Sequence, residues 1–234
     1  SSSWDSDGQL GEAFLTRKSF AIGRTEGGMG ASWDVARPVM ERALGTVDSA
    51  KIVSICDDYP PHLEKASKYA GPEAKTFDNY AKMLKEIRPQ AVVVATPLHL
   101  HHDMVLEALE AGAAVFCEKT LCRTVADAKE IAAEVEKRKA VFQIGLQRRS
   151  NAIYRQAVAM VQTGMLGRIS AIKCQWHRNN NWRRPVPFPK NDPQWTTLER
   201  KLNWRLYKDY SGGLMTELAS HQLDVANWML GTTP

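Results

Sequence analysis

The stretch AVVVATPLHLHHDMVLEALEAGAAVFCEKTL, residues 91–121, decides the fold. It opens with a short β-branched apolar run, continues as an amphipathic segment that ends at Gly112, and closes with a second apolar run. Strand, helix and strand in this order predict a crossover unit with two parallel strands and a covering helix. Because such crossovers are almost always right-handed, repeating them builds a doubly wound sheet that binds ligands at the carboxyl ends of its strands.

The same alternation extends from about residue 50 to 145. Thr124, followed by Asp127 three residues later, predicts a capped helix start, and Leu98–Ala111 is a second helix. The apolar stripe of the capped helix consists of Val125, Ala128, Ile131, Ala132 and Val135. We expect strands at Ser19–Gly23, Lys51–Cys56, Ala74–Phe77, Ala91–Ala95, Ala113–Cys117 and Ala140–Ile144. The fold class is therefore α/β, with a Rossmann doubly wound parallel sheet.

The pattern changes after about residue 146. An amphipathic helix at Asn151–Thr163 is followed by a strand at Arg168–Arg178, a loop without periodicity at Asn179–Trp195 and a last helix at Gly213–Leu230. No partner strands for Arg168–Arg178 are visible, so the second sheet looks incomplete. We divide the chain into an N-terminal segment (1–18), a Rossmann dinucleotide-binding domain (19–148) and the start of a second α/β domain (149–234).

Composition narrows the class of protein. The chain has 234 residues, 44% of them hydrophobic, and no stretch reaches the roughly 18 apolar residues of a membrane-spanning helix. The net charge is +5, but 31 Lys and Arg are interleaved with 26 Asp and Glu, which argues against a nucleic-acid surface. Only Arg183 and Arg184, beside Trp182, indicate a local anion site. The N-terminus lacks the order of a signal peptide, so the protein is cytoplasmic, or exported with its signal removed.

Several kinds of catalytic site are excluded by spacing. The cysteines lack zinc-type spacing, and we expect buried, reduced thiols at Cys56, Cys117, Cys122 and Cys174. The histidines at 99, 101 and 102 lack a third ligand on a fixed backbone, so we expect no metal. Neither a serine nucleophile elbow nor a Walker loop is present.

Polar residues follow the expected strands where a dinucleotide would bind. Asp57 comes directly after one strand, where an acid can accept hydrogen bonds from the adenosine ribose and repel a 2′-phosphate, which favours NAD over NADP. Alternatively, Asp57 and Asp58 only end the strand and cap the next helix. Thr96 and Pro97 end another strand, and the histidines that follow them are candidates for contact with a phosphate or nicotinamide.

Two groups of residues are candidates for acid–base chemistry. Lys119, next to Glu118, follows a strand, where partial burial would lower its pKa and let it exchange a proton with a hydroxyl group. An exposed Glu-Lys pair is the alternative. In the last helix, Glu217, His221 and Asp224 share a face, so Glu217 could orient the imidazole. His221 could equally be a core histidine.

Four motifs in fixed order resemble the Gfo/Idh/MocA family of NAD(P)-dependent oxidoreductases: residues 91–121, GLQRRSNAIYR, GMLGRISAIKCQWHR and SGGLMTELASHQLDVANWMLG. The resemblance covers about residues 51–234. It implies a Rossmann domain followed by a domain built on an open, mostly antiparallel sheet, with sugars or polyols as substrates. Family members are usually longer, so the resemblance also implies that this chain is a fragment.

Site residues follow from the resemblance by position. Lys119 matches the lysine of a Glu-Lys-Pro motif, although Thr120 replaces the proline, and Glu118 lies on the cofactor side. His221 matches the family's histidine, and Glu217 stands where an aspartate is usual. The remaining cofactor contacts are Thr96, Pro97, His99, His101, Gln147 and Arg148. The glycine fingerprint is not recognisable, and Gly28 and Gly30 are the candidates for a divergent phosphate loop.

The sequence thus predicts an NAD-dependent oxidoreductase that acts on a secondary alcohol, with NADP less favoured. His221, held by Glu217, takes the hydroxyl proton with help from Lys119. The substrate side consists of Trp176, His177, Arg178, Asn179, Trp204, Arg205 and Asp224, although the tryptophans could equally be core residues. Alternatives are a redox-neutral NAD-dependent glycosidase and a non-catalytic sugar or dinucleotide sensor. We expect a carbohydrate partner, no nucleic acid and no membrane, and a homo-oligomer where the second domain is complete.

Overall fold

The computed structural model describes residues 19–23, 51–177 and 183–232. The candidate phosphate-loop glycines Gly28 and Gly30 lie outside the described residues, as do Arg178 and Asn179. No helix in the described part of the chain is long and apolar enough to cross a membrane.

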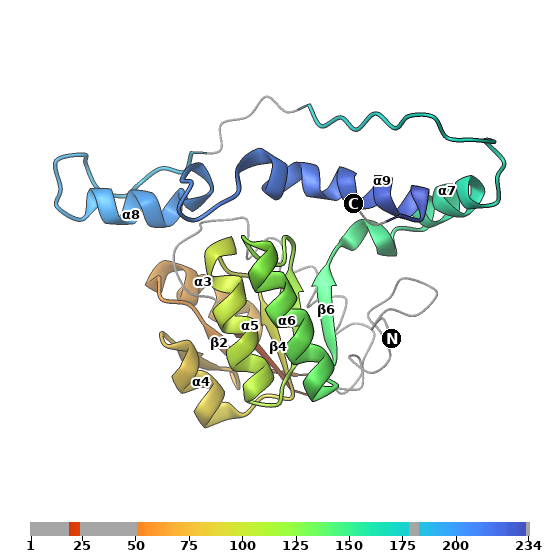
Figure 1. The fold of residues 1–234 in the computed structure, drawn as a ribbon. Helices are drawn as coiled ribbons and strands as arrows, with labels where there is room; N and C mark the ends of the chain where they lie inside the picture. Colours follow the sequence, from red (N-terminus) through yellow and green to blue (C-terminus); the bar gives the residue numbers. More distant parts are fainter. Residues whose placement is uncertain (1–18, 24–50, 178–182, 233–234) are drawn as a thin grey trace.

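A parallel sheet forms the core of the first unit (Figure 1). Within the described residues it has six strands in the order β3-β2-β1-β4-β5-β6. Their bounds are Ser19–Gly23 (β1), Lys51–Cys56 (β2), Lys75–Phe77 (β3), Ala91–Val94 (β4), Ala114–Glu118 (β5) and Phe142–Gly145 (β6). The order reverses between β1 and β4, which is the switch point where doubly wound sheets bind ligands. The predicted Rossmann sheet is confirmed.

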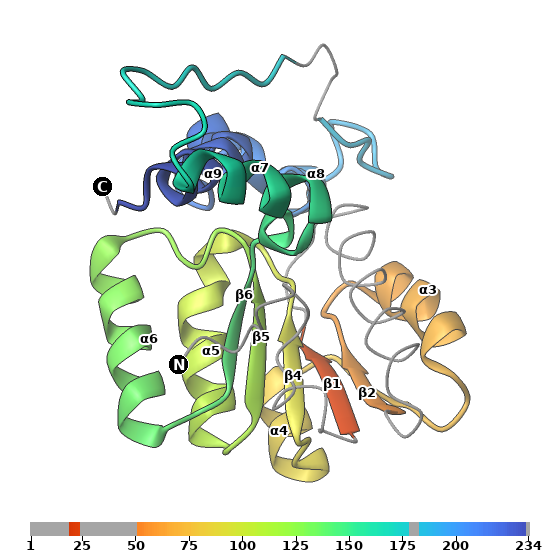
Figure 2. The same ribbon diagram turned by 90° about the vertical axis from the view of Figure 1, so that its right-hand side faces the viewer.

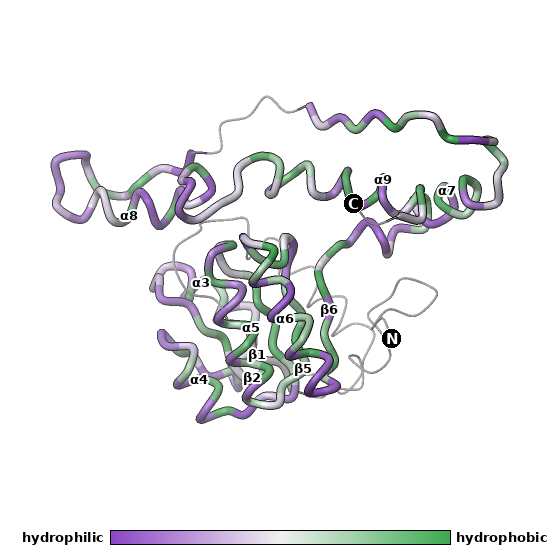
Figure 3. The backbone as a smooth tube through the Cα atoms, viewed as in Figure 1, coloured by the Kyte–Doolittle hydropathy of each residue, from purple (hydrophilic) through white to green (hydrophobic). Residues whose placement is uncertain are grey.

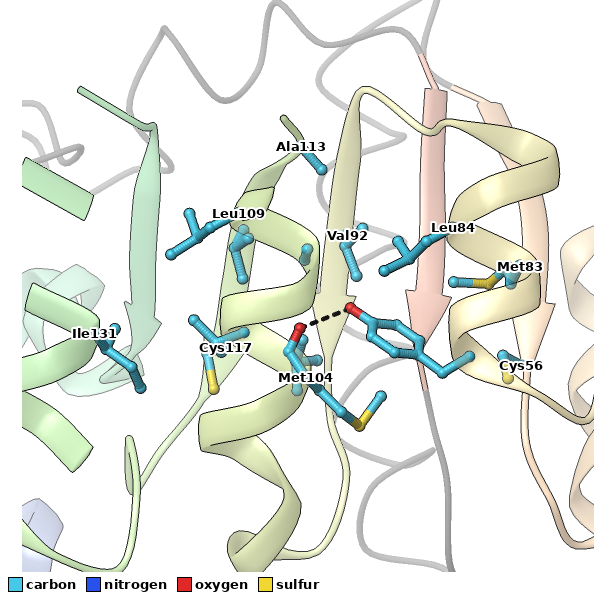
Figure 4. Close-up of a cluster of buried hydrophobic side chains, with 14 of the residues drawn as sticks. Cys56, Met83, Leu84, Val92, Met104, Leu109, Ala113, Cys117 and Ile131 are labelled. Atoms are coloured by element: carbon cyan, nitrogen blue, oxygen red, sulfur yellow. Dashed lines mark hydrogen bonds between the residues drawn. The ribbon is translucent and has the colours of Figure 1, made fainter. Parts of the chain in front are cut away.

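Alternate strand residues are buried in two cores, one on each face of the sheet. Val92 and Val94 face one core, whereas Ala91 and Val93 face the other. The first core is filled from helices α4 (Tyr80–Ile87), α5 (His101–Glu110) and α6 (Val125–Arg138), and α3 (Pro60–Ala70) contributes Ala66 to the second. The Tyr80 hydroxyl donates to the Met104 carbonyl oxygen at 2.9 Å, which satisfies a buried polar group inside the first core. Figure 4 marks this hydrogen bond at Met104 with a dashed line.

The capped helix is confirmed, with a narrower apolar stripe than predicted. Thr124 Oγ1 accepts a hydrogen bond from the Asp127 backbone N–H at 3.1 Å, and Ile131 is buried. Val125 is 71% exposed, because it is the first residue of α6 and lies at its free end. Ala132 is exposed as well. Ile131 and Val135 pack against the first core, so the part of the stripe that is buried is narrower than the predicted one.

The second unit lies over the carboxyl ends of the strands, as Figure 2 shows. It contains α7 (Ala152–Gln162), α8 (Trp195–Leu202), the π-helix η4 (Met215–Ala219) and α9 (Ser220–Leu230). Three short 3₁₀ helices complete the described elements: η1 (Leu98–Leu100) follows β4, η2 (Gln147–Ser150) lies between β6 and α7, and η3 (Trp204–Leu206) follows α8. Helix α8 was not predicted. The predicted last helix is instead divided into η4 and α9.

The predicted strand at Arg168–Arg178 is wrong for the described residues 168–177. They run as an irregular, mostly exposed segment, because the described chain offers no neighbouring strand to complete a hydrogen-bonded ladder. Cys174 is exposed there, whereas the other three thiols are buried as expected. Large apolar side chains of this unit are also exposed, among them Ile153, Leu214 and Leu223. Figure 3 shows hydrophobic and hydrophilic residues mixed along the chain of this unit.

Candidate active site

The register of the sheet brings the candidate residues to one edge. Val94 of β4 lies opposite Gly23 of β1 and Cys117 of β5, so the residues that follow these strands lie along the same carboxyl edge. Thr96 and Pro97 follow β4, and the β5 strand ends in Glu118 and continues into Lys119. This edge faces the second unit (Figure 2).

The described residues at this edge fit a dinucleotide. Asp57, 3% exposed at the end of β2, receives a hydrogen bond at Oδ1 from the Tyr59 backbone N–H at 2.9 Å. Its Oδ2 lies 3.5 Å from Nδ1 of buried His62. The buried Thr96 hydroxyl has no hydrogen-bond partner among the described residues, as expected of a group that awaits a ligand. The acid after β2 would accept hydrogen bonds from an adenosine ribose. The hydroxyl group after β4 would bind nearer the nicotinamide.

His101 is a structural residue, which corrects the prediction that it contacts the cofactor. It is 2% exposed, with Nε2 2.9 Å from the Thr96 carbonyl oxygen and Nδ1 2.9 Å from that of Thr120. Burial lowers its pKa despite these backbone contacts. Because both ring nitrogens face carbonyl groups, none remains for a cofactor, and the ring instead joins the ends of β4 and β5.

Replacing His101 with leucine is expected to destabilise the protein by about 1–3 kcal/mol, because it leaves buried carbonyl groups without a donor. The glutamine variant keeps an N–H donor and should lose less. Urea unfolding of both variants measures the difference. Equal stability of the leucine variant and the wild type would show that these contacts contribute nothing.

Glu118 lies partly buried over Gly145. A Cβ atom added at Gly145 would stand 3.0 Å from Oε2 of Glu118, so the glycine makes room for the carboxyl group. Burial raises the pKa of Glu118 to about 7, although the neighbouring Lys119 opposes this shift. A carboxyl group in this state is available both to hold and to release a proton near neutral pH.

Lys119 reaches from the first unit to the second. Its amine donates to the main-chain carbonyl oxygen of Glu217, and the Thr120 hydroxyl donates to that of Thr216 at 2.7 Å. Both acceptors lie in the π-helix η4, a distortion that often marks functional sites. Burial and, to a lesser extent, the charge of Arg205 lower the pKa of Lys119. The peptide bond between Lys119 and Thr120, the residue that replaces the proline of the Glu-Lys-Pro motif, is cis.

His221 lies in α9, with its ring against that of Trp176. It is 5% exposed, and burial, followed by the charges of Lys119 and Arg148, lowers its pKa to about 4. The Trp176 ring stacks on it with centroids 5.8 Å apart. Nδ1 of His221 has no hydrogen-bond partner among the described residues. His221 is therefore a neutral imidazole at physiological pH, and the charge of Lys119 acts on it.

The predicted pairing of Glu217 with His221 is wrong. The Glu217 carboxylate is 3.1 Å from Nε of Arg205 and accepts a hydrogen bond from the Ser211 hydroxyl at 3.2 Å. Glu217 belongs to η4 and His221 to α9, so the π-helical turn breaks the four-residue spacing that would align them. Ser211 was missed, since nothing in the sequence links it to a carboxylate six residues away.

The other predicted site residues in the described part of the chain either contact a neighbouring side chain or are exposed. Buried Trp204 stacks under Arg205, whose guanidinium carbon is 4.2 Å from the ring centroid, so Trp204 packs in the protein interior. Asp224 binds Arg149 in a bidentate ion pair at 2.7–3.0 Å. His99 packs against Tyr210 with ring centroids 4.6 Å apart. Gln147 and His177 are exposed.

Comparison with known proteins matches both units to one family. The family model described as "Oxidoreductase family, NAD-binding Rossmann fold" (GFO_IDH_MocA) matches residues 28–146, and the GFO/IDH/MocA C-terminal domain matches residues 154–234. The expected NAD-binding fold is thus confirmed.

Individual relatives share about a quarter of their aligned residues with this chain. Scyllo-inositol 2-dehydrogenase (NAD(+)) of Bacillus subtilis is 25% identical, over 80% of this chain and 48% of its own length. Levoglucosan dehydrogenase of Pseudarthrobacter phenanthrenivorans is 25% identical, over 90% of this chain and 51% of its own. The WlbA dehydrogenase of Bordetella pertussis, solved with NADH and UDP-GlcNAcA, has a TM-score of 0.68 at 24% identity, covering 92% of this chain and 58% of that one. The chain spans about half the length of the curated relatives it matches.

Proposed function

Because the chain belongs to the Gfo/Idh/MocA oxidoreductase family, we propose that the protein oxidises a secondary alcohol of a sugar or polyol with NAD. The observation that carries this proposal is that the Lys119 amine, at the end of β5, donates to the Glu217 main-chain oxygen in η4, the turn that leads directly into α9 with His221. The curated relatives described above are named for scyllo-inositol and levoglucosan, which supports a polyhydroxylated substrate.

Bound NAD would supply the acceptor for the hydride of the carbinol carbon. The protein's own part is to remove the hydroxyl proton. A neutral imidazole with a pKa of about 4 has a free lone pair at neutral pH, so His221 is the proton acceptor. Lys119, whose amine is buried and carries a lowered pKa, holds the alcohol oxygen and stabilises the charge that develops there.

Glu217 has a supporting role in this proposal. Its main-chain oxygen accepts from the Lys119 amine, and its carboxylate anchors Arg205. It therefore positions the lysine, whereas the imidazole of His221 is placed by burial and by Trp176.

The proposal is tested by incubating the protein with NAD and a panel that contains scyllo-inositol, myo-inositol, levoglucosan, common hexoses and the sugar acids D-glucuronate, D-galacturonate and D-gluconate. We expect NADH absorbance to appear with at least one of them. Release of an aglycone from a glycoside without accumulation of NADH would point instead to redox-neutral hydrolysis. Binding of NAD without any turnover would contradict catalysis.

Asp57 is expected to select NAD. Replacing it with serine removes the carboxylate that would bind the ribose hydroxyls and repel a 2′-phosphate, so NAD should bind about tenfold more weakly while NADP binds more tightly. Calorimetric titration with each dinucleotide measures both. An unchanged ratio of the two affinities would show that Asp57 only ends β2.

A further inference from the structure

Among the described residues, Arg148 is held in place without a counter-ion. Its guanidinium carbon lies 4.9 Å from the Trp176 ring centroid and 5.2 Å from that of Tyr154. Nη1 donates to the Tyr154 hydroxyl at 2.9 Å and to Oε1 of Gln222. Two aromatic rings and two neutral acceptors thus fix the guanidinium group, and its remaining N–H groups are not used by these contacts.

The adjacent Arg149 makes the contrast clear. It too lies over a tryptophan, 5.3 Å from the Trp228 ring centroid, but it is neutralised by Asp224 at 2.7 Å. In the described part of the chain, no carboxylate forms an ion pair with Arg148. Two neighbouring arginines are therefore immobilised in the same way, and only one has its charge balanced.

Arg148 is also close to the reacting groups. Trp176, which it contacts, stacks on His221, and the charges of Arg148 and Lys119 both act on that imidazole. The nearest carboxylate on η4, that of Glu217, is bound by Arg205 and Ser211. The charges of Glu217 and Glu118 act on Lys119, whereas no carboxylate of the described residues forms an ion pair with Arg148. The positive charge of oxidised nicotinamide would add to that of Arg148.

Building on the proposed function, we propose that the substrate carries a carboxylate close to the alcohol that is oxidised, as in a uronate or aldonate, and that Arg148 binds it. A guanidinium group presents N–H donors in a planar fork that matches a carboxylate, and an arginine already fixed by its neighbours loses little freedom on binding. A neutral sugar would leave the excess positive charge unbalanced. The carboxylate balances it and fixes the orientation of the alcohol toward His221.

The test compares ligands that differ in charge alone. D-glucuronate, D-galacturonate and D-gluconate, each paired with its amide, are titrated calorimetrically into the full chain with and without NADH. We expect at least one acid to bind about tenfold or more tightly than its amide, and Arg148→Gln to abolish that preference. Equal binding of every acid and its amide, no binding of any acid, or tighter binding of glucose 6-phosphate would overturn the proposal.

Arg149→Gln is the matched control, because it removes a neighbouring arginine whose charge is already balanced. It should lower stability and leave the preference for acid over amide unchanged. If Arg148→Gln weakens NADH binding and keeps the preference, Arg148 binds the cofactor instead and the proposal is wrong. Oxidation of neutral polyols as efficiently as acids would overturn this inference alone, whereas selective binding of acids without NADH formation would overturn only the proposed function.

Discussion

Lys119→Met is expected to lower kcat for alcohol oxidation by about 10²–10⁴-fold while the affinity for NAD changes little. Methionine keeps most of the side-chain volume but removes the amine that donates to the Glu217 main-chain oxygen across the two units. The alcohol oxygen would then lose the cation that stabilises its developing negative charge. Steady-state formation of NADH gives kcat, and calorimetric titration gives the dissociation constant for NAD.

Two further variants make this result specific. Lys137→Met removes an exposed amine that pairs with Glu134 on α6, and should leave kcat unchanged. His221→Asn should reduce kcat to a similar extent as Lys119→Met, because it removes the proton acceptor. If Lys119→Met retains full kcat, or loses activity only because NAD no longer binds, Lys119 has no role in the chemical step.

The Rossmann sheet was predictable because its signals are local. The central strand Ala91–Val94 is buried on both faces and therefore reads as a continuous apolar run. Thr124 caps the start of α6 through a hydrogen bond to the backbone of Asp127, only three residues away, so this helix start can be recognised from four consecutive residues. The positions of Asp57 and Lys119 after strands followed from the same local pattern, since the ends of parallel strands meet at one edge.

The errors arose where contacts are distant in sequence. Arg168–Arg178 reads as a strand, but strand formation also depends on a neighbour that the described residues do not provide. His101 belongs to a histidine cluster that suggested ligand contact, and only the packing of α5 against the ends of β4 and β5 shows that carbonyl groups occupy both ring nitrogens. The difference in charge neutralisation between Arg148 and Arg149 likewise depends on Asp224, which is more than seventy residues away and pairs with Arg149 alone of the two.

The π-helix explains why the last helix was read only in part. A four-residue spacing places Glu217 and His221 together on a regular α-helix. The same spacing gives no sign of the wider π-helical turn at Met215–Ala219. The turn directs the Glu217 carboxylate to Arg205 and leaves main-chain oxygens of η4 for Lys119 and Thr120. Lys119 and Glu217 thus meet at η4, whereas the Glu217 carboxylate pairs with Arg205 and not with His221.

Glu118→Gln and His221→Asn are expected to give opposite changes in the pH dependence of stability. Glu118 has its pKa raised from 4.5 to about 7 in the folded protein, so between these values folding retains a proton and stability falls as pH rises. The pKa of His221 is lowered from 6.5 to about 4, so between these values folding excludes a proton and stability rises with pH. In the wild type the two effects oppose each other wherever the windows overlap.

Each variant removes one of the two effects and exposes the other. Relative to the wild type, Glu118→Gln should become more stable with rising pH across the overlap, and His221→Asn less stable, each by up to about 1.4 kcal/mol per pH unit. Groups elsewhere in the chain titrate alike in both variants and cancel in the comparison. Urea unfolding at several pH values within the overlap gives the slopes. Parallel slopes in the two variants would mean that burial shifts neither group, and would remove the basis for treating His221 as a neutral base.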